Sequence, residues 1–127
     1  MPRNWLSCPP NSLIFVSVRI DSERYLALID PGSVFNMISP KLSLALGLPQ
    51  QGYQRVLSVH GDTRLRPVVM LPPIGVAEIE LPPDKAVINE MNRIQHGLDL
   101  LLGVSAFKNG RLHIDFKEGR VYVFPPR

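Results

Sequence analysis

An aspartate at the end of an apolar segment is the residue of this sequence best placed to do chemistry. Residues 27–33 read Ala-Leu-Ile-Asp-Pro-Gly-Ser, so apolar residues lead directly into Asp30 and a tight turn follows. A carboxylate fixed at the edge of a buried strand can act as a general acid or base. The segment 30–33 is also a favourable β-turn, with aspartate first, proline second and glycine third. Taken alone, the motif is therefore more typical of a structural turn than of a catalytic loop.

Other residue types that could do chemistry lack the spacing that their chemistry needs. Ser105 follows Gly-Val and begins a motif like the nucleophile elbow of serine hydrolases, but the closing glycine is absent. The three histidines, His60, His96 and His113, do not have metal-ligand spacing, so neither a metal nor a cofactor is expected. Cys8 is the single cysteine, which excludes a disulfide within the chain.

The elements that must position Asp30 are predicted to be strands. Residues 13–20 are rich in branched and aromatic side chains and end in alternation, which favours a strand. The polar residues 21–24 suit a turn, and residues 25–29 favour a return strand that ends at Asp30.

A helix is predicted after the short apolar segment 35–38. Ser39 can cap the free amides at its start, and Pro40 suits its first position. Gly47 is typical of its C-terminal end.

The rest of the chain favours further short strands and turns. The predicted elements are a hairpin of residues 55–60 and 63–70 around Gly61-Asp62, a strand at 74–81 with Glu78 and Glu80 on a solvated face, a strand at 86–88, an apolar run at 98–104, a short helix at 105–108 and a terminal hairpin of residues 112–116 and 121–124. The sum is an all-β domain with one or two short helices.

Composition excludes several classes of function. A chain of 127 residues that is 45% apolar fits one globular domain, and its 13 prolines favour short strands over long helices. The net charge of +3 is mild and the basic residues are scattered along the sequence, so no nucleic-acid partner is expected. No apolar run reaches the ~20 residues that span a bilayer, and no signal peptide is visible. A cytoplasmic protein without a membrane partner is therefore predicted.

The order of these elements, together with two motifs, resembles the retropepsin-like aspartic proteases, the single-domain family that includes retroviral proteases. The first motif is the segment 25–33, which has Asp-Pro-Gly where the family has Asp-Thr/Ser-Gly. The second is the apolar-apolar-glycine block Leu101-Leu102-Gly103. Either motif is weak by itself, but both in this order are fairly specific.

The resemblance implies a closed, dimeric retropepsin-like barrel formed by residues 13–124, with residues 1–12 as an N-terminal segment and 125–127 as a tail. It implies an aspartic endopeptidase that needs no cofactor and acts on a peptide or protein substrate. Each chain supplies one catalytic aspartate, here Asp30, so a homodimer is expected to bring two together.

The same resemblance assigns roles to the residues around Asp30. Two carboxyls ~3 Å apart share one proton, and the charged one takes a proton from the water that attacks the peptide carbonyl. A mildly acidic pH optimum follows. Gly32 would direct its amide at the carboxylate, and the hairpin tip His60-Gly61-Asp62 would be a flap over the substrate.

Pro31 is the one departure from the family motif. The family's Thr or Ser carries a hydroxyl that bonds to the loop of the partner subunit, whereas Pro31 has neither a hydroxyl nor a backbone N–H. The dimer would then be weaker, or its loops would be held in another way, for instance by Ser33. One outcome is a slow or conditional protease; the alternative is an impaired peptide-binding or dimerisation module of the same fold. A non-catalytic β-rich interaction domain is a hypothesis of a different class.

Overall fold

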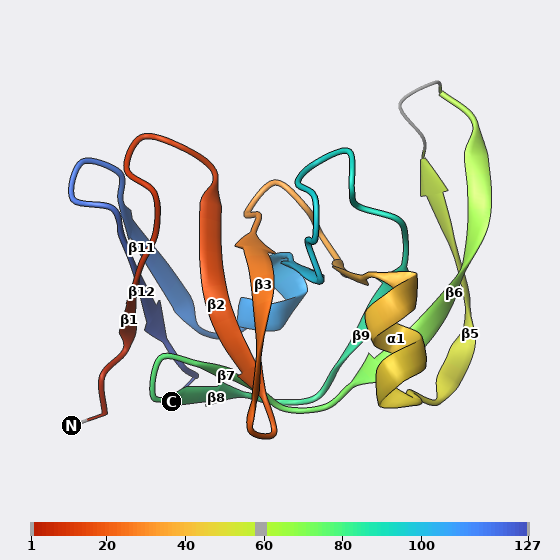
Figure 1. Cartoon of the computed structure of the whole chain (residues 1–127), viewed down its shortest axis with the longest axis horizontal. Coiled ribbons are helices and arrows are strands. Elements are labelled where there is room, and N and C mark those ends of the chain that lie inside the picture. Colours follow the sequence, from red (N-terminus) through yellow and green to blue (C-terminus); the bar gives the residue numbers. More distant parts are fainter. Residues whose placement is uncertain (1, 58–60, 127) are drawn as a thin grey trace.

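Two β-sheets make up most of the protein (Figure 1). The computed structural model describes residues 2–57 and 61–126. Within these residues, a nine-stranded sheet has the order β5-β6-β9-β4-β10-β3-β2-β7-β8, and a three-stranded sheet has the order β1-β12-β11. The strands are β1 (Trp5–Ser7), β2 (Ile14–Ile20), β3 (Glu23–Ile29), β4 (Asn36–Ile38), β5 (Gln50–Leu57), β6 (Thr63–Leu71), β7 (Ile74–Val76), β8 (Ile79–Leu81), β9 (Asp84–Ile88), β10 (Leu100–Leu102), β11 (Arg111–Asp115) and β12 (Arg120–Phe124), and the helices are α1 (Pro40–Leu46) and the short 3₁₀ helix η1 (Val104–Phe107).

The strands that lead to Asp30 form as the sequence predicts. β2 and β3 pair antiparallel from Ile14 opposite Ile29 to Ile20 opposite Glu23. β10 then lies parallel to β3 on its other side, with Leu101 opposite Leu28. A parallel partner must come from far along the chain, because parallel strands need a long crossover connection. This pairing brings the two sequence motifs together.

Helix α1 has the predicted caps. The Ser39 hydroxyl accepts a hydrogen bond of 3.2 Å from the Leu42 amide, and Pro40 occupies the first turn. Gly47 ends the helix in the left-handed conformation, with φ of 58°. Because a residue with a Cβ atom is strained at this φ, glycine is favoured at this position. The second predicted helix is present as η1.

The single strand predicted for residues 74–81 is wrong. The segment forms two strands, β7 and β8, that fold back on each other with Val76 opposite Ile79. Ala77 takes the turn conformation with φ of 54°. Alanine rarely adopts positive φ, so the sequence carries no turn signal at this point. Glu78 therefore lies in a turn, and it does not share a strand face with Glu80.

The prediction of a closed barrel is also wrong. In the part of the chain that the structure describes, β5 and β8 are the edge strands of the larger sheet and do not pair with each other. The chain leaves β8 through Pro82 and Pro83, which have no amide hydrogen to extend the pairing. At the other end, every residue of β5 except Val56 is exposed. Both sheets therefore stay open.

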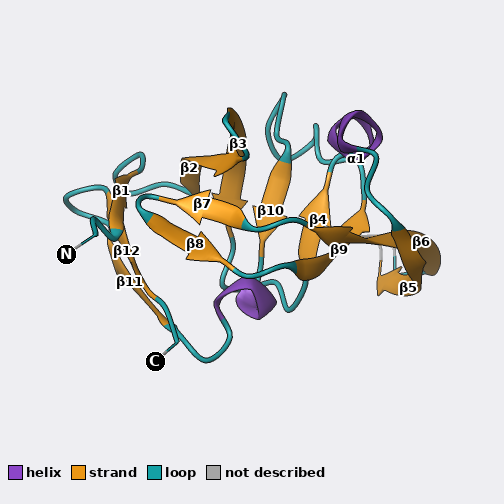
Figure 2. Cartoon of the chain, turned by 90° about the horizontal axis from the view of Figure 1, so that it is seen from below, coloured by secondary structure: helices purple, strands orange, loops and turns teal. Residues whose placement is uncertain are grey.

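The three-stranded sheet stands at the opposite end of the molecule from the β5–β6 hairpin (Figures 1 and 2). The predicted terminal hairpin is β11–β12, and β1, which the sequence analysis did not predict, pairs with β12. Val121 and Val123 are buried and pack into the same core as the large sheet. No helix in the described residues is long and apolar enough to cross a membrane.

Candidate active site

Asp30 lies directly after β3, where the parallel pairing with β10 ends. Its backbone N–H donates a hydrogen bond of 2.9 Å to the carbonyl of Leu102, which continues the ladder by one residue. Its side chain is half-buried. The main chain of Asp30 is therefore fixed by the sheet, while its carboxylate retains access to solvent.

The turn after Asp30 directs an amide at the carboxylate. The Ser33 N–H donates to the Asp30 carbonyl at 3.1 Å, which closes the predicted β-turn. The Gly32 N–H donates to Asp30 Oδ1 at 2.9 Å, as expected from the sequence. A Cβ atom at Gly32 would lie 3.2 Å from the same oxygen, so a larger residue would crowd the carboxylate. The turn holds one carboxylate oxygen and leaves Oδ2 without a hydrogen bond from any described residue.

Pro31 and Ser33 differ in what they contribute to this loop. Pro31 is exposed at the second position of the turn. The Ser33 hydroxyl donates a hydrogen bond of 2.8 Å to the Phe35 carbonyl within its own loop. The single hydroxyl proton of Ser33 is therefore used in a hydrogen bond within the chain, and its oxygen can only accept a hydrogen bond from a partner subunit.

Gly103 lies where the second motif crosses the Asp30 loop. The Val104 N–H donates a hydrogen bond of 2.7 Å to the Ser33 carbonyl. A Cβ atom at Gly103 would lie 2.5 Å from the Phe35 carbonyl oxygen and 2.6 Å from that of Ser33. Leu101 and Leu102 before it are both buried. Glycine is thus required by the close crossing of two backbones.

Asn36 fixes this crossing, although no motif in the sequence pointed to it. The side chain is completely buried, and its Oδ1 accepts a hydrogen bond of 3.0 Å from the Gly103 N–H. Its Nδ2 donates to Asp84 Oδ2 at 2.9 Å and to the Lys85 carbonyl at 3.0 Å. All the polar atoms of its side chain are therefore used. The one signal in the sequence was a polar residue inside the apolar segment 35–38.

The β5–β6 hairpin is the predicted flap. His60 lies outside the described residues, whereas Gly61 has φ of 87° and suits a turn. Asp62 forms an exposed ion pair with Arg64 at 3.7 Å. The end of β5, the start of β6 and the end of β3 all point toward the upper side of Figure 1. The described ends of β5 and β6 and the end of β3, which Asp30 follows in the chain, therefore lie on the same side of the molecule in this view.

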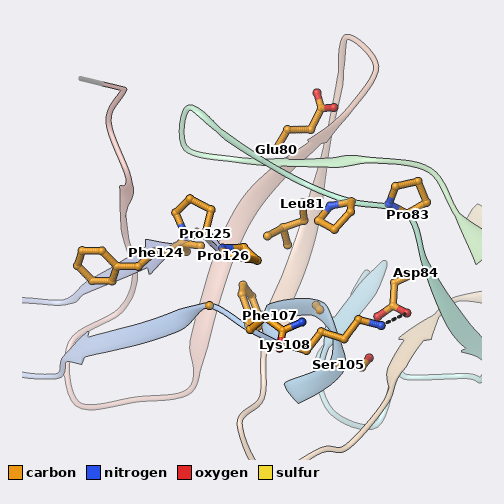
Figure 3. A pocket seen from close by; sticks show the side chains of 15 residues that line it. Glu80, Leu81, Pro83, Asp84, Ser105, Phe107, Lys108, Phe124, Pro125 and Pro126 are labelled. Carbon is orange, nitrogen blue, oxygen red and sulfur yellow. Dashed lines mark ion pairs between the residues drawn. The ribbon is translucent and has the colours of Figure 1, made fainter.

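One small cavity borders the second motif, and another lies beside η1. The first, of about 130 Å³, is lined by Pro31, Gly103, Phe107 and Arg111, among others. The second, of about 110 Å³, lies beside the ion pair between Lys108 Nζ and Asp84 Oδ1, which are 3.9 Å apart (Figure 3). Asp30 lines neither cavity, and both are far below the size of a peptide-binding cleft. Neither of these two cavities is therefore the substrate site of Asp30.

No metal centre emerges at the site or elsewhere in residues 2–57 and 61–126. No three His, Cys, Asp or Glu side chains are grouped there so that they could hold a metal ion.

A protein-family model matches most of the chain. The family model described as aspartyl protease matches residues 16–106, a stretch that holds Asp30 and the Leu101-Leu102-Gly103 block. No curated protein sequence matches the chain significantly.

Solved structures share the fold at low sequence identity. The retropepsin-like aspartic protease from Rickettsia conorii is 12% identical with a TM-score of 0.67, and the match covers 95% of this chain and 89% of that one. The retroviral protease-like domain of Ddi1 from Leishmania major is 16% identical with a TM-score of 0.57, covering 90% and 95%. Simian foamy virus protease is 16% identical with a TM-score of 0.51, covering 72% and 89%. The chain therefore belongs to the aspartyl protease family and has a retropepsin-like fold.

Proposed function

We propose that the protein is an aspartic endopeptidase that works as a homodimer with one Asp30 from each subunit. The observation that carries the proposal is the Asp30 carboxylate, held at the end of a central strand by the Gly32 N–H at 2.9 Å. The chain has this motif once, whereas the reaction needs two carboxyls within hydrogen-bond reach of one water. A second copy is the simplest source of the other carboxyl.

The chemistry of such a pair follows from electrostatics. Two carboxyls about 3 Å apart share one proton, because both cannot be charged at that distance. The charged carboxylate takes a proton from the bound water as the water oxygen attacks the peptide carbonyl carbon. The neutral carboxyl donates its proton to the carbonyl oxygen. The tetrahedral intermediate then breaks its C–N bond as the carboxyl that took the water proton gives it to the nitrogen. The other carboxylate recovers a proton from a hydroxyl of the intermediate, which releases both products.

Two further elements take supporting roles in this proposal. The hairpin tip at His60, Gly61 and Asp62 closes over an extended substrate and keeps bulk water out. Gly103 and the two leucines before it fix the strand against which the Asp30 loop rests. The observation that supports this role is the hydrogen bond of 2.9 Å from the Asp30 N–H to the Leu102 carbonyl.

An impaired binding module is the second candidate, and Pro31 favours it. Proline supplies no hydroxyl to a partner's loop, and the Ser33 hydroxyl already donates to Phe35. In that case the fold would bind a peptide or a second copy and would not cut.

Cleavage of a denatured protein by the wild type and by Asp30→Asn tests the reaction. We expect the wild type to cleave at mildly acidic pH and the variant to cleave at least about 100-fold more slowly, which is the usual contribution of a general acid or base. Equal activity in both would remove Asp30 from the mechanism. Absence of activity in both, with a dimer present in sedimentation equilibrium, would establish the binding module instead.

A matched pair of variants separates the two effects of Pro31. Pro31→Thr adds a hydroxyl and an amide, whereas Pro31→Ala adds the amide alone. If the missing hydroxyl weakens the dimer, Pro31→Thr tightens dimerisation by about 5- to 150-fold relative to Pro31→Ala, since two symmetric hydrogen bonds contribute about 0.5–1.5 kcal/mol each. Equal dissociation constants for the two variants would show that the hydroxyl is not what the loop lacks.

A further inference from the structure

The outward face of the three-stranded sheet gathers aromatic and arginine side chains. Trp5, Tyr122 and His113 lie directly opposite one another across the three strands, and Phe124 lies opposite Arg111. Alternation along β12 turns Val121 and Val123 inward, where both are buried. Ser7 and Asp115 share the other face with six residues that together form the aromatic–arginine face: Trp5, Arg111, His113, Arg120, Tyr122 and Phe124.

Guanidinium groups lie over the rings of this face. The Arg120 guanidinium carbon is 4.3 Å from the centre of the Trp5 ring, and that of Arg3 is 5.1 Å from it. The Arg111 guanidinium carbon is 4.9 Å from the centre of the Phe124 ring. These distances fit cation–π contacts. Flat, exposed cationic groups are therefore layered on half-buried rings.

The acidic groups nearby are occupied by backbone amides. Asp115 lies opposite Arg120 in the sheet, but its Oδ1 accepts from the Glu118 N–H at 2.9 Å. Glu78 Oε2 accepts from the backbone N–H of Arg3 at 2.8 Å. Among the described residues, none of the arginines that contact these rings forms an ion pair with a carboxylate. These two carboxylates keep their charge, but the three arginines over the rings outnumber them, so the named groups leave a net positive charge that an anionic partner would neutralise.

We propose that the aromatic–arginine face binds single-stranded nucleic acid. The β11–β12 hairpin places Arg111 and Arg120 on this face, and the pairing of β1 with β12 adds Trp5, with Arg3 over its ring. Phosphates would pair with the guanidinium groups, and bases would stack on the rings or on the guanidinium planes. The site is independent of the proposed peptidase reaction.

The spacing of the rings favours a single strand over a duplex. Tyr122 and Phe124 are two residues apart on one strand, so their Cα atoms are about 6.8 Å apart. Neighbouring bases of an extended single strand can reach such a spacing, whereas bases stacked inside a duplex are hidden from the protein. An acidic protein segment would satisfy the arginines but would leave the rings without flat partners.

Trp5 makes the binding directly observable, since it is the single tryptophan of the chain. Titration with an oligothymidylate of about 12 nucleotides, a length within the range that single-strand sites cover, should quench its fluorescence as bases stack. Anisotropy of a labelled oligonucleotide gives the affinity in parallel. With three arginine–phosphate contacts, the slope of log Kobs against log salt concentration should be about −2, at about −0.7 per neutralised phosphate.

Matched variants locate the contact. Arg3→Gln/Arg120→Gln should weaken binding at least fivefold at low salt and reduce the slope to about −0.7, which leaves the Arg111 contact alone. Arg55→Gln/Arg93→Gln removes the same charge from two exposed arginines elsewhere and should change neither the affinity nor the slope by as much. Circular dichroism of both double variants checks that the sheet is intact.

Three results would overturn the proposal. One is the absence of both quenching and an anisotropy change at low salt, and another is equal loss of binding in the two double variants. The third is that a duplex or polyglutamate binds as tightly as the oligonucleotide without quenching Trp5, which would assign the face to generic anions or to an acidic protein.

Discussion

The backbone N–H of Gly103 donates a hydrogen bond of 3.0 Å to Oδ1 of Asn36, although 67 positions separate the two residues in the sequence. The bond is buried and ties the second sequence motif to the strand that follows the Asp30 loop. The geometry around Asp30 therefore depends on a side chain that makes no contact with the carboxylate. The buried hydrogen bonds of Asn36 therefore help to position the loop that carries Asp30.

Replacement of Asn36 by an apolar residue should destabilise the fold. Asn36→Leu leaves the Gly103 N–H, an Asp84 carboxylate oxygen and the Lys85 carbonyl without their partner. Since each buried group left unpaired costs about 1–3 kcal/mol, we expect the free energy of unfolding in urea to fall by about 2–5 kcal/mol. Asn92→Leu is the control, because the Asn92 side chain is exposed and accepts one bond of 3.3 Å. Similar losses in the two variants would contradict a special role for Asn36.

The two glycines of the motifs should respond differently to alanine. In Gly103→Ala the new Cβ meets backbone oxygens at 2.5 and 2.6 Å, which cannot move without shifting both loops. We expect a loss of about 1–3 kcal/mol or more in unfolding free energy, the usual cost of overpacking. In Gly32→Ala the Cβ meets only Asp30 Oδ1 at 3.2 Å, so stability should change little. If the peptidase proposal holds, Gly32→Ala should instead lower cleavage, because the carboxylate is displaced. Equal stability of the two variants would be inconsistent with this view of the crossing.

The cap of α1 should contribute a measurable part of the stability. Ser39→Ala removes the oxygen that accepts from the Leu42 N–H at 3.2 Å. We expect the free energy of unfolding to fall by about 1 kcal/mol, the typical value of an N-cap. Ser39→Thr keeps the oxygen and should retain most of that contribution. If the threonine variant is as unstable as the alanine variant, the capping bond is not the source of the effect.

Stability should depend on the Cys8 thiol at alkaline pH. Burial raises the pKa of Cys8 above its ordinary value of 9.0. As pH rises past that value, the unfolded chain loses its thiol proton first, so the folded state is progressively disfavoured until its own pKa is passed. The contribution is thus complete below about pH 9 and is lost above it. Urea unfolding of the wild type and Cys8→Ala, under reducing conditions, measures the difference. Parallel declines of the two proteins above that pH would show that Cys8 has no part in it.

Local sequence patterns predicted the elements whose hydrogen bonds stay local. The Asp30–Ser33 turn, the caps of α1 and the β11–β12 hairpin each depend on residues close together in the chain. Their side chains favour one backbone conformation wherever they occur, so the pattern can be recognised without the fold. The β7–β8 hairpin could not be predicted in this way, because Ala77 adopts a turn conformation that its own side chain does not favour and that only its surroundings enforce.

The sequence by itself thus determined a mostly β chain with an aspartate in a tight turn at the end of a buried strand. Only the tertiary structure decided that β10 pairs with β3, that the Asn36 side chain bonds to Gly103, that the sheets stay open and that β1 brings Trp5 beside Arg120. These features join residues far apart in the chain. They are stabilised by burial and by hydrogen bonds that exist only after the strands have assembled. No local pattern encodes which distant strand each strand will pair with.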